Sequence, residues 1–379
     1  MNRSFWHLKL ARAWEEKSVV WLTGVRRSGK TTLCREISQK NYFDCELVRV
    51  RRLLEDPEQF FQDAEGAQHL VLDEIHRLDN ASEVLKIAAD YFPKIKVLAT
   101  GSSTLAASKK FKDSLTDRKR VVFLTPLASM EWKNFGREDL IHRMIRGGLP
   151  PFFLAEKFPE SGYQDWIESF WAKDIEELFS IDKKNAFLKF FELLALQSGG
   201  LFEAKSFAAP CGVSHPTIAS YLRVMEETHI AYVLRPFFKN PSKEIISAPK
   251  VYFFDTGFIT YFNGYQELHA EERGHYWEHI VLNELLTFLN RSDIHYWRSK
   301  TGAEVDFVIK LRGKPPIAIE CKWKSDAFDS RGLEKFRSIH PDGVNLLVAP
   351  DISAKRIRRG DPALLLTPLS KLKEVIEGI

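Results

Sequence analysis

The most specific chemical pattern in the chain lies near its N-terminus, where an apolar run over residues 19–22 leads into Gly24-x4-Gly29-Lys30-Thr31. Glycines in such a loop let backbone N–H groups approach phosphate oxygens closely, and the helical pattern that follows adds the positive potential of a helix N-terminus. The lysine neutralises phosphate charge, and the next hydroxyl binds Mg²⁺. The spacing therefore predicts an ATP and Mg²⁺ site whose loop contacts come from Gly24, Arg27, Ser28, Gly29, Lys30, Thr31 and Thr32.

Two adjacent carboxylates, Asp73 and Glu74, follow a second apolar run about 40 residues later. We expect Asp73 to bind the metal ion through water and Glu74 to polarise the attacking water. A third strand pattern, over residues 94–100, ends in Gly-Ser-Ser. The hydroxyl of Thr100 or Ser102 is a candidate for contact with the γ-phosphate, and a serine-rich turn is the simpler alternative.

A basic stretch over residues 109–120 carries six basic and two acidic side chains, a net charge of +4. Its simplest interpretation is a solvated loop. The alternative is an arginine that reaches the nucleotide of a neighbouring subunit, because a planar guanidinium stabilises developing phosphate charge. Arg118 is the candidate for this catalytic role, and Arg120 is the second choice.

Together these segments resemble the prokaryotic AAA+ ATPases that carry a DUF4143 region at the C-terminus. The resemblance rests on Gly-Val-Arg-Arg-Ser-Gly-Lys-Thr-Thr-Leu from Gly24, Leu-Asp-Glu-Ile-His-Arg from Leu72, Thr-Gly-Ser-Ser from Thr100, and a Pro-Leu…Glu segment that ends at Glu131. It covers nearly the whole chain and implies a ring-forming ATPase. The family usually has Gly-Arg where this chain has Asp-Arg118, so the arginine is kept while the turn before it differs.

The middle of the chain has the pattern of a winged helix, an arrangement that the DUF4143 proteins share. A short helical pattern, a Gly-Val-Ser turn and an amphipathic helical pattern over 215–226 form a helix-turn-helix. Four apolar residues of the second helix recur at helical spacing and are expected to face the core: Ile218, Tyr221, Leu222 and Met225. Two strand patterns follow, at 230–234 and 250–254, with a lysine-containing wing between them.

If this unit binds DNA, the helix over 215–226 would enter the major groove and the wing would contact phosphates. The side chains expected to make these contacts are His215, Thr217, Ser220, Arg223, Lys239 and Lys243. The helix is poor in basic residues and carries Glu226 and Glu227 near its end. A winged helix that only packs against protein is therefore an equal alternative.

A second chemical pattern lies near the C-terminus, where Glu320-x-Lys322 follows Asp306 on the preceding strand pattern and Glu278 on a helical pattern. Alternation is expected to bury one face of each strand, with Val305, Phe307 and Ile309 in the first and Ile317, Ile319 and Cys321 in the second. On the other faces, Asp306 and Glu320 would chelate Mg²⁺ and Lys322 would position water for attack on a phosphodiester.

This second set resembles the PD-(D/E)xK nuclease superfamily, in which Glu278 matches the helix acid. A chance Glu-x-Lys pattern, or a nuclease fold that only docks nucleic acid, are the alternatives. A basic strip over 355–359 contacts phosphate or is simply solvated.

The elements that must position these groups are those of an α/β protein with two or three domains, as 379 residues suggest. We expect an AAA+ P-loop domain at 1–148, a helical and winged-helix domain at 149–265, and a nuclease-like α/β domain at 266–379. No apolar run approaches the roughly 20 residues of a membrane helix. Four scattered cysteines without a CxxC pair indicate a reducing, cytoplasmic interior. The net charge of +4 neither requires nor excludes nucleic acid.

The sequence thus predicts ATP hydrolysis coupled to remodelling of DNA or movement along it, by a homo-oligomeric ring for which a hexamer is one candidate. A second hypothesis is an ATP-regulated, Mg²⁺-dependent DNA endonuclease in defence or signalling. A third is a DNA-binding regulator with slow ATP turnover.

Overall fold

The computed structural model describes residues 3–101, 115–176, 179, 181, 183–238, 248–358 and 363–379. Its N-terminal part contains a five-stranded parallel sheet in the order β2-β3-β4-β1-β5. The strands are β1 (Val19–Thr23), β2 (Tyr42–Asp44), β3 (His69–Asp73), β4 (Lys96–Thr100) and β5 (Lys119–Phe123). Because all five run in one direction, the loops that follow β1, β3 and β4 meet at the same edge of the sheet.

Helices cover both faces of this sheet, which explains why its central strands β1, β3 and β4 are mostly apolar and buried. Val20 packs on the side of α1 (Ser4–Glu16) and α2 (Lys30–Ile37). Trp21 packs on the side of α4 (Pro57–Asp63) and α5 (Ala81–Tyr91), because neighbouring residues of a strand point to opposite faces. The short α3 (Val48–Leu53) follows β2.

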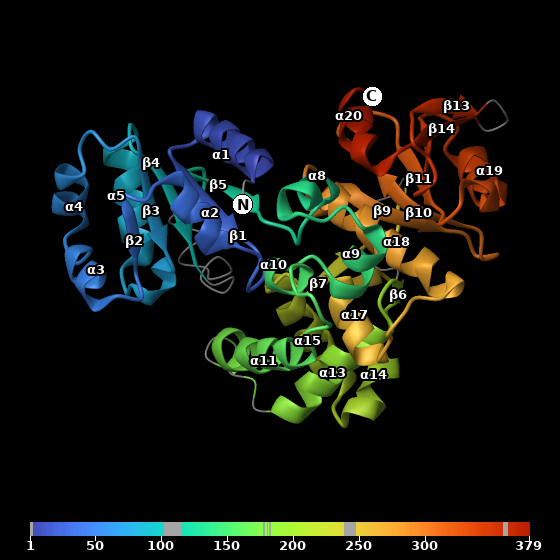
Figure 1. The fold of residues 1–379 in the computed structure, drawn as a ribbon, viewed down its shortest axis with the longest axis horizontal. Coiled ribbons are helices and arrows are strands. Elements are labelled where there is room, and N and C mark those ends of the chain that lie inside the picture. The colour runs from blue at the N-terminus through green and yellow to red at the C-terminus, as the bar shows by residue number, and fades with distance from the viewer. Residues whose placement is uncertain are drawn as a thin grey trace.

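A helical region comes next, and most of it lies in the lower part of the molecule in Figure 1. Its helices are α8 (Ser129–Trp132), α9 (Leu140–Arg146), α10 (Pro150–Phe153), α11 (Glu160–Phe170) and α13 (Lys184–Leu196). A π-helical segment, Trp171–Glu176, continues α11.

The elements from α13 onward have the order expected of a winged helix. They are α13, β6 (Gly200–Leu201), α14 (Ala204–Cys211), α15 (His215–Glu227), β7 (Ala231–Leu234) and β8 (Lys250–Phe253), with the strands paired antiparallel as β6-β8-β7. Ser214 caps α15 by accepting a hydrogen bond from Thr217 N at 3.3 Å. The four apolar residues of α15 that were expected to face the core are buried.

The C-terminal part contains a six-stranded mixed sheet in the order β13-β14-β12-β11-β10-β9. Its strands are β9 (Ile294–Arg298), β10 (Glu304–Ile309), β11 (Ile317–Cys321), β12 (Asn345–Val348), β13 (Arg356–Arg358) and β14 (Leu364–Thr367). Helices α17 (Thr256–Asn263) and α18 (Ala270–Leu286) precede it, while α19 (Arg331–Ile339) and α20 (Leu372–Glu377) lie within and after it. Apolar residues of α18 and α19 belong to two different cores of this part.

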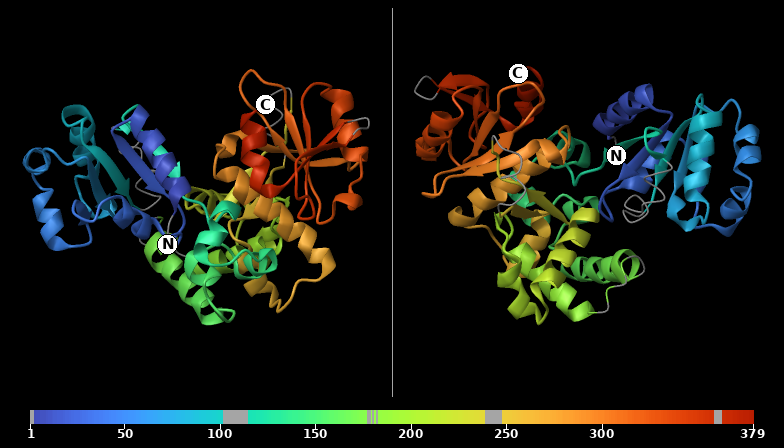
Figure 2. Two further views of the ribbon diagram at one scale, coloured as in Figure 1. Left: turned by 45° about the horizontal axis from the view of Figure 1, so that its top comes forward. Right: turned by 180° about the vertical axis from the view of Figure 1, so that it is seen from behind.

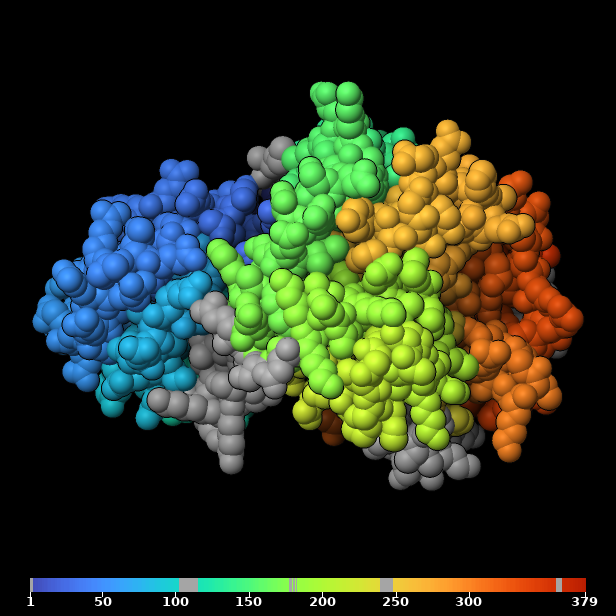
Figure 3. All heavy atoms as spheres, turned by 90° about the horizontal axis from the view of Figure 1, so that it is seen from below, coloured from blue at the N-terminus to red at the C-terminus, as the bar shows by residue number. Residues whose placement is uncertain are grey.

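The two sheets lie at opposite ends of the molecule, and the helical region lies between and below them (Figures 1 and 2). Seen from below, the green and yellow middle region contacts both the blue N-terminal part and the orange and red C-terminal part (Figure 3). Within the described residues, no helix is both long and apolar enough to cross a membrane.

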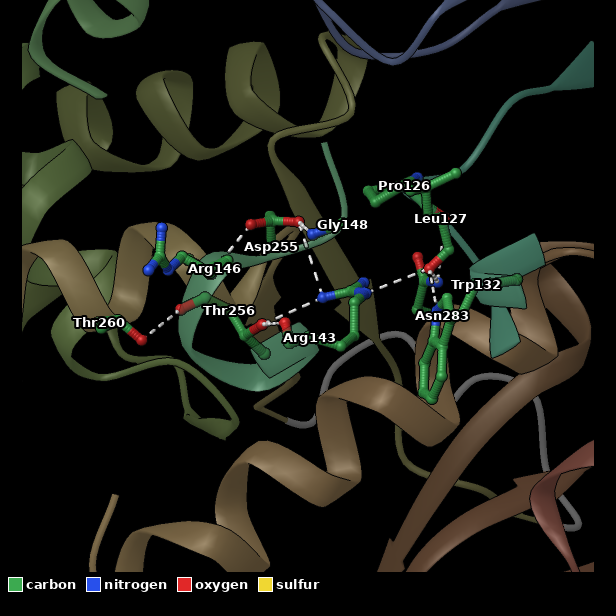
Figure 4. A network of polar contacts seen from close by, with 12 residues as sticks. Pro126, Leu127, Trp132, Arg143, Arg146, Gly148, Asp255, Thr256, Thr260 and Asn283 are labelled. Carbon is green, nitrogen blue, oxygen red and sulfur yellow. Dashed lines mark hydrogen bonds and ion pairs between the residues drawn. The ribbon is translucent and has the colours of Figure 1, made fainter. Parts of the chain in front are cut away.

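A buried polar junction connects these parts (Figure 4). Arg143 on α9 donates to the carbonyl of Leu127 and to the hydroxyl of Thr256, each at 3.2 Å. Asn283 on α18 donates to the carbonyl of Pro126 at 3.1 Å. A buried guanidinium is costly unless it is hydrogen-bonded, so these contacts hold the segment after β5 against α17 and α18.

Candidate nucleotide site and acidic site

The predicted phosphate loop lies between β1 and α2, where Gly24 and Gly29 have φ angles of 153° and 95°. A Cβ on Gly24 would lie 2.5 Å from the carbonyl of Leu124, so no other residue fits there without a shift of the backbone. The loop borders a cavity of about 400 Å³, a size that suits a small-molecule ligand. The predicted loop residues that line this cavity are Gly24, Arg27, Gly29, Lys30, Thr31 and Thr32. Ser28 lies apart from them, because its side chain is fully buried.

Lys30 is held inside this loop by its own backbone. Its Nζ donates to the carbonyl of Gly24 at 2.9 Å and to that of Val25 at 3.1 Å. Burial lowers the pKa of Lys30, and the negative charges of Glu74 and Asp174 oppose this shift. The ammonium thus lies among backbone groups, at the position where a phosphate would need it.

Asp73 ends β3 with its carboxylate oriented by two hydroxyl groups. Tyr42 donates to it at 2.6 Å, and Thr100 donates to its other oxygen. The Thr100 hydroxyl also accepts from the backbone N–H of Glu74 at 3.0 Å. Thr100 is fully buried, and its hydroxyl contacts both the carboxylate of Asp73 and the backbone of Glu74. Ser102 lies outside the described residues. Oxygen ligands of this type suit Mg²⁺, so Thr31, Asp73 and the phosphates of a nucleotide fit that ion.

Glu74 has a strained backbone, and such strain often marks a functional site. Its φ is 55°, in a region that residues other than glycine seldom adopt, and its side chain lines the cavity. Its carboxylate lies 3.1 Å from Nδ1 of His76. Burial alone would raise the pKa of Glu74, but the hydrogen bond from His76 and the charge of Lys30 lower it overall. Glu74 is therefore ionised at neutral pH, as a water-polarising group must be.

The helical region closes the other side of the cavity, which sequence reasoning missed. Arg26 of the phosphate loop forms a 2.9 Å ion pair with Asp174 of the π-helical segment, and Trp166 donates to the Arg26 carbonyl at 3.1 Å. The residues of this region that line the cavity are Pro150, Pro151, Phe170, Lys173, Asp174, Thr228 and Ile230. They lie more than 100 residues from the loop, and no motif spacing in the sequence marks them.

Arg118 lies away from the nucleotide cavity of its own chain. It precedes β5, whose first residue is level with Val19 at the start of β1, so it lies at the sheet edge opposite the phosphate loop. Its Nε donates to Asp90 at 2.7 Å. Arg120 pairs with Glu16. Action of either arginine on the nucleotide of a second copy stays a prediction.

The predicted DNA-contacting residues are only partly on one surface. His215, Ser220 and Arg223 are exposed on α15, whereas Thr217 is half-buried and its hydroxyl bonds Ser214 Oγ at 2.8 Å. Thr217 thus helps to cap the helix. Lys239, Lys243 and the wing lie outside the described residues.

The acidic site near the C-terminus brings three of its four predicted residues into direct contact. Lys322 Nζ lies 2.9 Å from Glu320 and 3.5 Å from Asp306. Burial works against the charge of Lys322, but these two carboxylates raise its pKa overall. Burial and the neighbouring charge of Asp306 raise the pKa of both Glu320 and Glu278.

Glu278, the fourth predicted residue, bonds to a residue outside this group: its Oε2 accepts a hydrogen bond from the Tyr252 hydroxyl at 3.0 Å. Among the described residues, no three His, Cys, Asp or Glu side chains lie close enough together to hold a metal ion. Two carboxylates, Asp306 and Glu320, can still do so, because Mg²⁺ keeps several waters and is often bound through one or two carboxylates. Glu320 Oε1 is buried and has no hydrogen-bond partner within the described residues, so it has an unused acceptor for such an ion.

The expected alternation in β10 is wrong at one position. The pairing of β10 with β9 shifts register between Val305 and Val308. Val305 consequently packs with Val308, in a core separate from that of Phe307 and Ile309. This bulge contains Asp306, whose Oδ2 accepts from the backbone N–H of Cys321 at 2.7 Å. Bulges often redirect a side chain in this way. The polar residues of these strands are also buried, with Asp306 8% and Glu320 4% exposed.

A buried ion pair that the sequence did not reveal connects the phosphate loop to the segment after β5. Arg3 donates to both carboxylate oxygens of Glu131, at 2.6 and 3.1 Å, and to the carbonyl of Ser28 at 2.8 Å. Both charged side chains are only 2% exposed. Glu131 is the acid of the Pro-Leu…Glu segment, so Arg3 links that segment to the backbone of the phosphate loop.

Comparison with known families agrees with this geometry. Residues 16–133 match the AAA domain, residues 137–269 match a domain of unknown function called DUF8612, and residues 273–369 match DUF4143, another domain of unknown function. The chain thus combines a region similar to the AAA domain with a C-terminal region similar to DUF4143. The expected family resemblance and α/β fold class of this chain are thereby confirmed, while the three predicted domain boundaries stay predictions.

Relatives of this chain include two uncharacterized proteins, Mb2031c of Mycobacterium bovis and Rv2008c of Mycobacterium tuberculosis. Each is 29% identical over 335 residues, which cover 86% of this chain and 75% of the relative. Among solved structures, the Walker-type ATPase paby2304 of Pyrococcus abyssi is 16% identical with a TM-score of 0.42, and 69% of this chain and 95% of that one are covered. Cdc6p of Pyrobaculum aerophilum is 13% identical with a TM-score of 0.30, and the coverage is 69% and 93%.

Proposed function

We propose that this protein binds and hydrolyses ATP with Mg²⁺ and couples the reaction to work on DNA as a homo-oligomer. The observation that carries the ATPase proposal is the cavity that Gly24, Gly29, Lys30 and Glu74 line together. One wall offers backbone N–H groups and the half-buried ammonium of Lys30, and the other offers an ionised carboxylate. This is the charge distribution that phosphoryl transfer to water requires.

Each residue then has a separate task. The loop's N–H groups and the N-terminus of α2 bind phosphate oxygens, and Lys30 neutralises the charge that develops on them. Glu74 orients the attacking water, while Thr31 and Asp73 would hold the metal ion. When bound, Mg²⁺ supplies further neutralisation of the β- and γ-phosphates.

A contact between the phosphate loop and the winged helix supports coupling to DNA. Thr228, which directly follows α15, lines the nucleotide cavity. The next residue, His229, has a 2.9 Å hydrogen bond between its Nε2 and the hydroxyl of Thr23, the last residue before the loop. Burial lowers the pKa of His229 to about 3, so the ring is neutral. The helix that would contact DNA with Arg223 therefore ends directly at the phosphate loop.

Measurement of ATP turnover tests this function. Wild-type protein and Lys30→Ala would be compared alone and with single-stranded, duplex, forked and four-way DNA. We expect hydrolysis only by the wild type, with a higher rate on at least one DNA form and larger assemblies in the presence of ATP. If wild-type turnover equals that of Lys30→Ala, the ATPase proposal is wrong. If hydrolysis occurs but no DNA changes it, the DNA proposal is wrong and a slow regulator or an ATPase that acts on protein replaces it.

DNA affinity should depend strongly on salt and only weakly on sequence, because the candidate contacts are lysines and arginines suited to phosphate. Replacement of Lys239 and Lys243 together should weaken binding to every sequence. A preference of more than about a thousandfold for one sequence would instead indicate a specific regulator.

Glu320 Oε1, which is buried and has no hydrogen-bond partner among the described residues, favours a second candidate function, a Mg²⁺-dependent DNA endonuclease. Asp306 and Glu320 would hold the ion, and Lys322 would position the water that attacks the phosphodiester. Plasmid nicking with Mg²⁺ or Mn²⁺, with and without ATP, tests it. Asp306→Asn and Glu320→Gln should each abolish nicking and leave ATP turnover unchanged. If the wild type never cuts any DNA form, the domain docks nucleic acid and does not cleave it.

A further inference from the structure

The strand that closes the winged helix also reaches the acidic site. Lys250 and Tyr252 are two residues apart on β8, so their side chains lie on the same face of the strand. Lys250 pairs with the carboxylate of Glu304, and the Tyr252 hydroxyl donates to Glu278 Oε2 at 3.0 Å. Two elements of the acidic site, β10 and α18, are thereby bound to a strand that belongs to the winged helix.

These contacts are buried and close to the carboxylates that would hold a metal ion. Lys250 is 6% exposed and Tyr252 is fully buried. Glu304 lies two residues before Asp306 on β10, and the ring of Tyr252 lies 5.9 Å from that of Phe307, the residue after Asp306. The negative charges of Glu278 and Asp306 both act on Lys250. β8 therefore contacts the acidic site on both sides of Asp306.

We propose that Tyr252 and Lys250 are positioning residues of the acidic site, so that the winged helix completes a metal site whose ligands come from the DUF4143 domain. This inference rests on the second proposed function. Tyr252 fixes the orientation of the Glu278 carboxylate beside Asp306 and Glu320, the residues that would hold the ion. Lys250, through Glu304, holds β8 against β10 at the distance that this hydrogen bond needs. Residues that orient the ligands of a metal in this way affect its affinity without touching it.

The proposal is tested by calorimetry of Mn²⁺ binding to the full-length, nucleotide-free protein. Only the binding that is lost in the Asp306→Asn variant is assigned to the acidic site. We expect Tyr252→Phe to weaken this affinity by about tenfold or more, since outer partners of metal ligands have effects of that size. Tyr232→Phe is the matched control: Tyr232 pairs with Tyr252 across the β7–β8 register, and its buried hydroxyl has no hydrogen-bond partner among the described residues. It should bind Mn²⁺ as the wild type does.

Glu278→Ala removes the acceptor of the same hydrogen bond, and it keeps the test decisive if Tyr252→Phe folds poorly. Its Mn²⁺ affinity should fall similarly, and adding Tyr252→Phe to it should cause little further loss. Wild-type affinity in Tyr252→Phe, or in Glu278→Ala, overturns the role of β8 while the metal site stands. If the wild type shows no Mn²⁺ binding that depends on Asp306, the metal site itself is absent and the inference fails with it.

Discussion

The nucleotide cavity and the acidic site are built for opposite charges and by opposite means. Gly24 and Gly29 allow the phosphate loop to present backbone N–H groups, and the ammonium of Lys30 rests on carbonyls of the same loop. In the acidic site, Asp306 and Glu320 are already paired with Lys322 and are nearly inaccessible. The first site lies on an open cavity and is ready for a polyanion. The second must exchange an internal ion pair for any cation that it binds.

The largest expected effect tests whether the nucleotide site needs an arginine from a second copy of the chain, whereas the acidic site needs none. Arg118→Ala should reduce ATP turnover by about 10³-fold or more, the scale of an arginine supplied to phosphoryl transfer from outside. Mixing it with Lys30→Ala protein should restore part of the turnover, because some interfaces then pair an intact arginine with an intact loop. The acidic site should be unaffected in both variants.

Two results would contradict this role of Arg118. One is a mixture that regains no turnover while the wild type stays monomeric with ATP. The other is normal turnover of Arg118→Ala, in which case its pair with Asp90 is only a surface contact and Arg120 becomes the candidate.

The next effect separates binding from chemistry inside the nucleotide site. Glu74→Gln should lower turnover by about 10²–10⁴-fold, since it removes the group that orients water. ATP affinity should persist, because Lys30 and Asp73 are retained, whereas Lys30→Ala should lose both affinity and turnover. Binding of a fluorescent ATP analogue, measured beside phosphate release, checks this. Normal turnover in Glu74→Gln would remove Glu74 from the catalytic role.

The difference in construction also explains how much the sequence could predict. Gly24, Lys30, Thr31 and the Asp73–Glu74 pair lie in short motifs, and their side-chain roles follow from local strand-loop-helix geometry. The partners that close the cavity, such as Asp174 and Thr228, come from a distant helical region and carry no spacing signal. Three strands of the parallel sheet, β1, β3 and β4, were similarly readable from apolar runs, because they are buried on both faces.

The acidic site was predictable in residue type but not in arrangement. Glu320 and Lys322 follow from a two-residue spacing on a strand. The bulge that turns Asp306 toward Cys321 leaves no mark in the alternation of apolar residues. The hydrogen bond from Tyr252 joins two regions of the fold, and such a contact depends on how β8 packs against α18 rather than on any local pattern.

The third effect tests the support beneath the phosphate loop. Glu131→Gln leaves the buried guanidinium of Arg3 without its counter-ion, and loss of one partner from a buried pair costs about 3–5 kcal/mol. We expect a lower unfolding midpoint and weaker ATP binding, because Arg3 also holds the carbonyl of Ser28. Glu374→Gln, which breaks an exposed pair with Lys371, is the control and should leave both quantities unchanged. An unfolding midpoint of Glu131→Gln equal to that of the control would contradict the supporting role.

The smallest expected effect is on the pH dependence of stability and comes from Glu284 on α18. This helix carries Asn283 of the buried polar junction and Glu278 of the acidic site. Burial raises the pKa of Glu284 from 4.5 to about 7, against the hydrogen bond that it accepts from Ser129 N at 2.9 Å. The folded chain therefore binds this proton more tightly than the unfolded chain does. The resulting stabilisation is complete below about pH 4.5 and is lost as the pH rises through about 7. A shift of this size corresponds to at most about 3 kcal/mol.

Glu284→Gln should remove this dependence, because the amide oxygen still accepts from Ser129 and never ionises. The variant should match the wild type in stability near pH 4.5 and exceed it at pH 8. The quantity to follow is the difference between the two unfolding midpoints across this pH range, since other titrating groups cancel from that difference. A difference that stays constant with pH would show that Glu284 is ionised in both states. The junction would then hold a buried carboxylate that the charge of Arg143 stabilises. In that case both regions would contain buried carboxylates paired with a cation, and they would not differ in this respect.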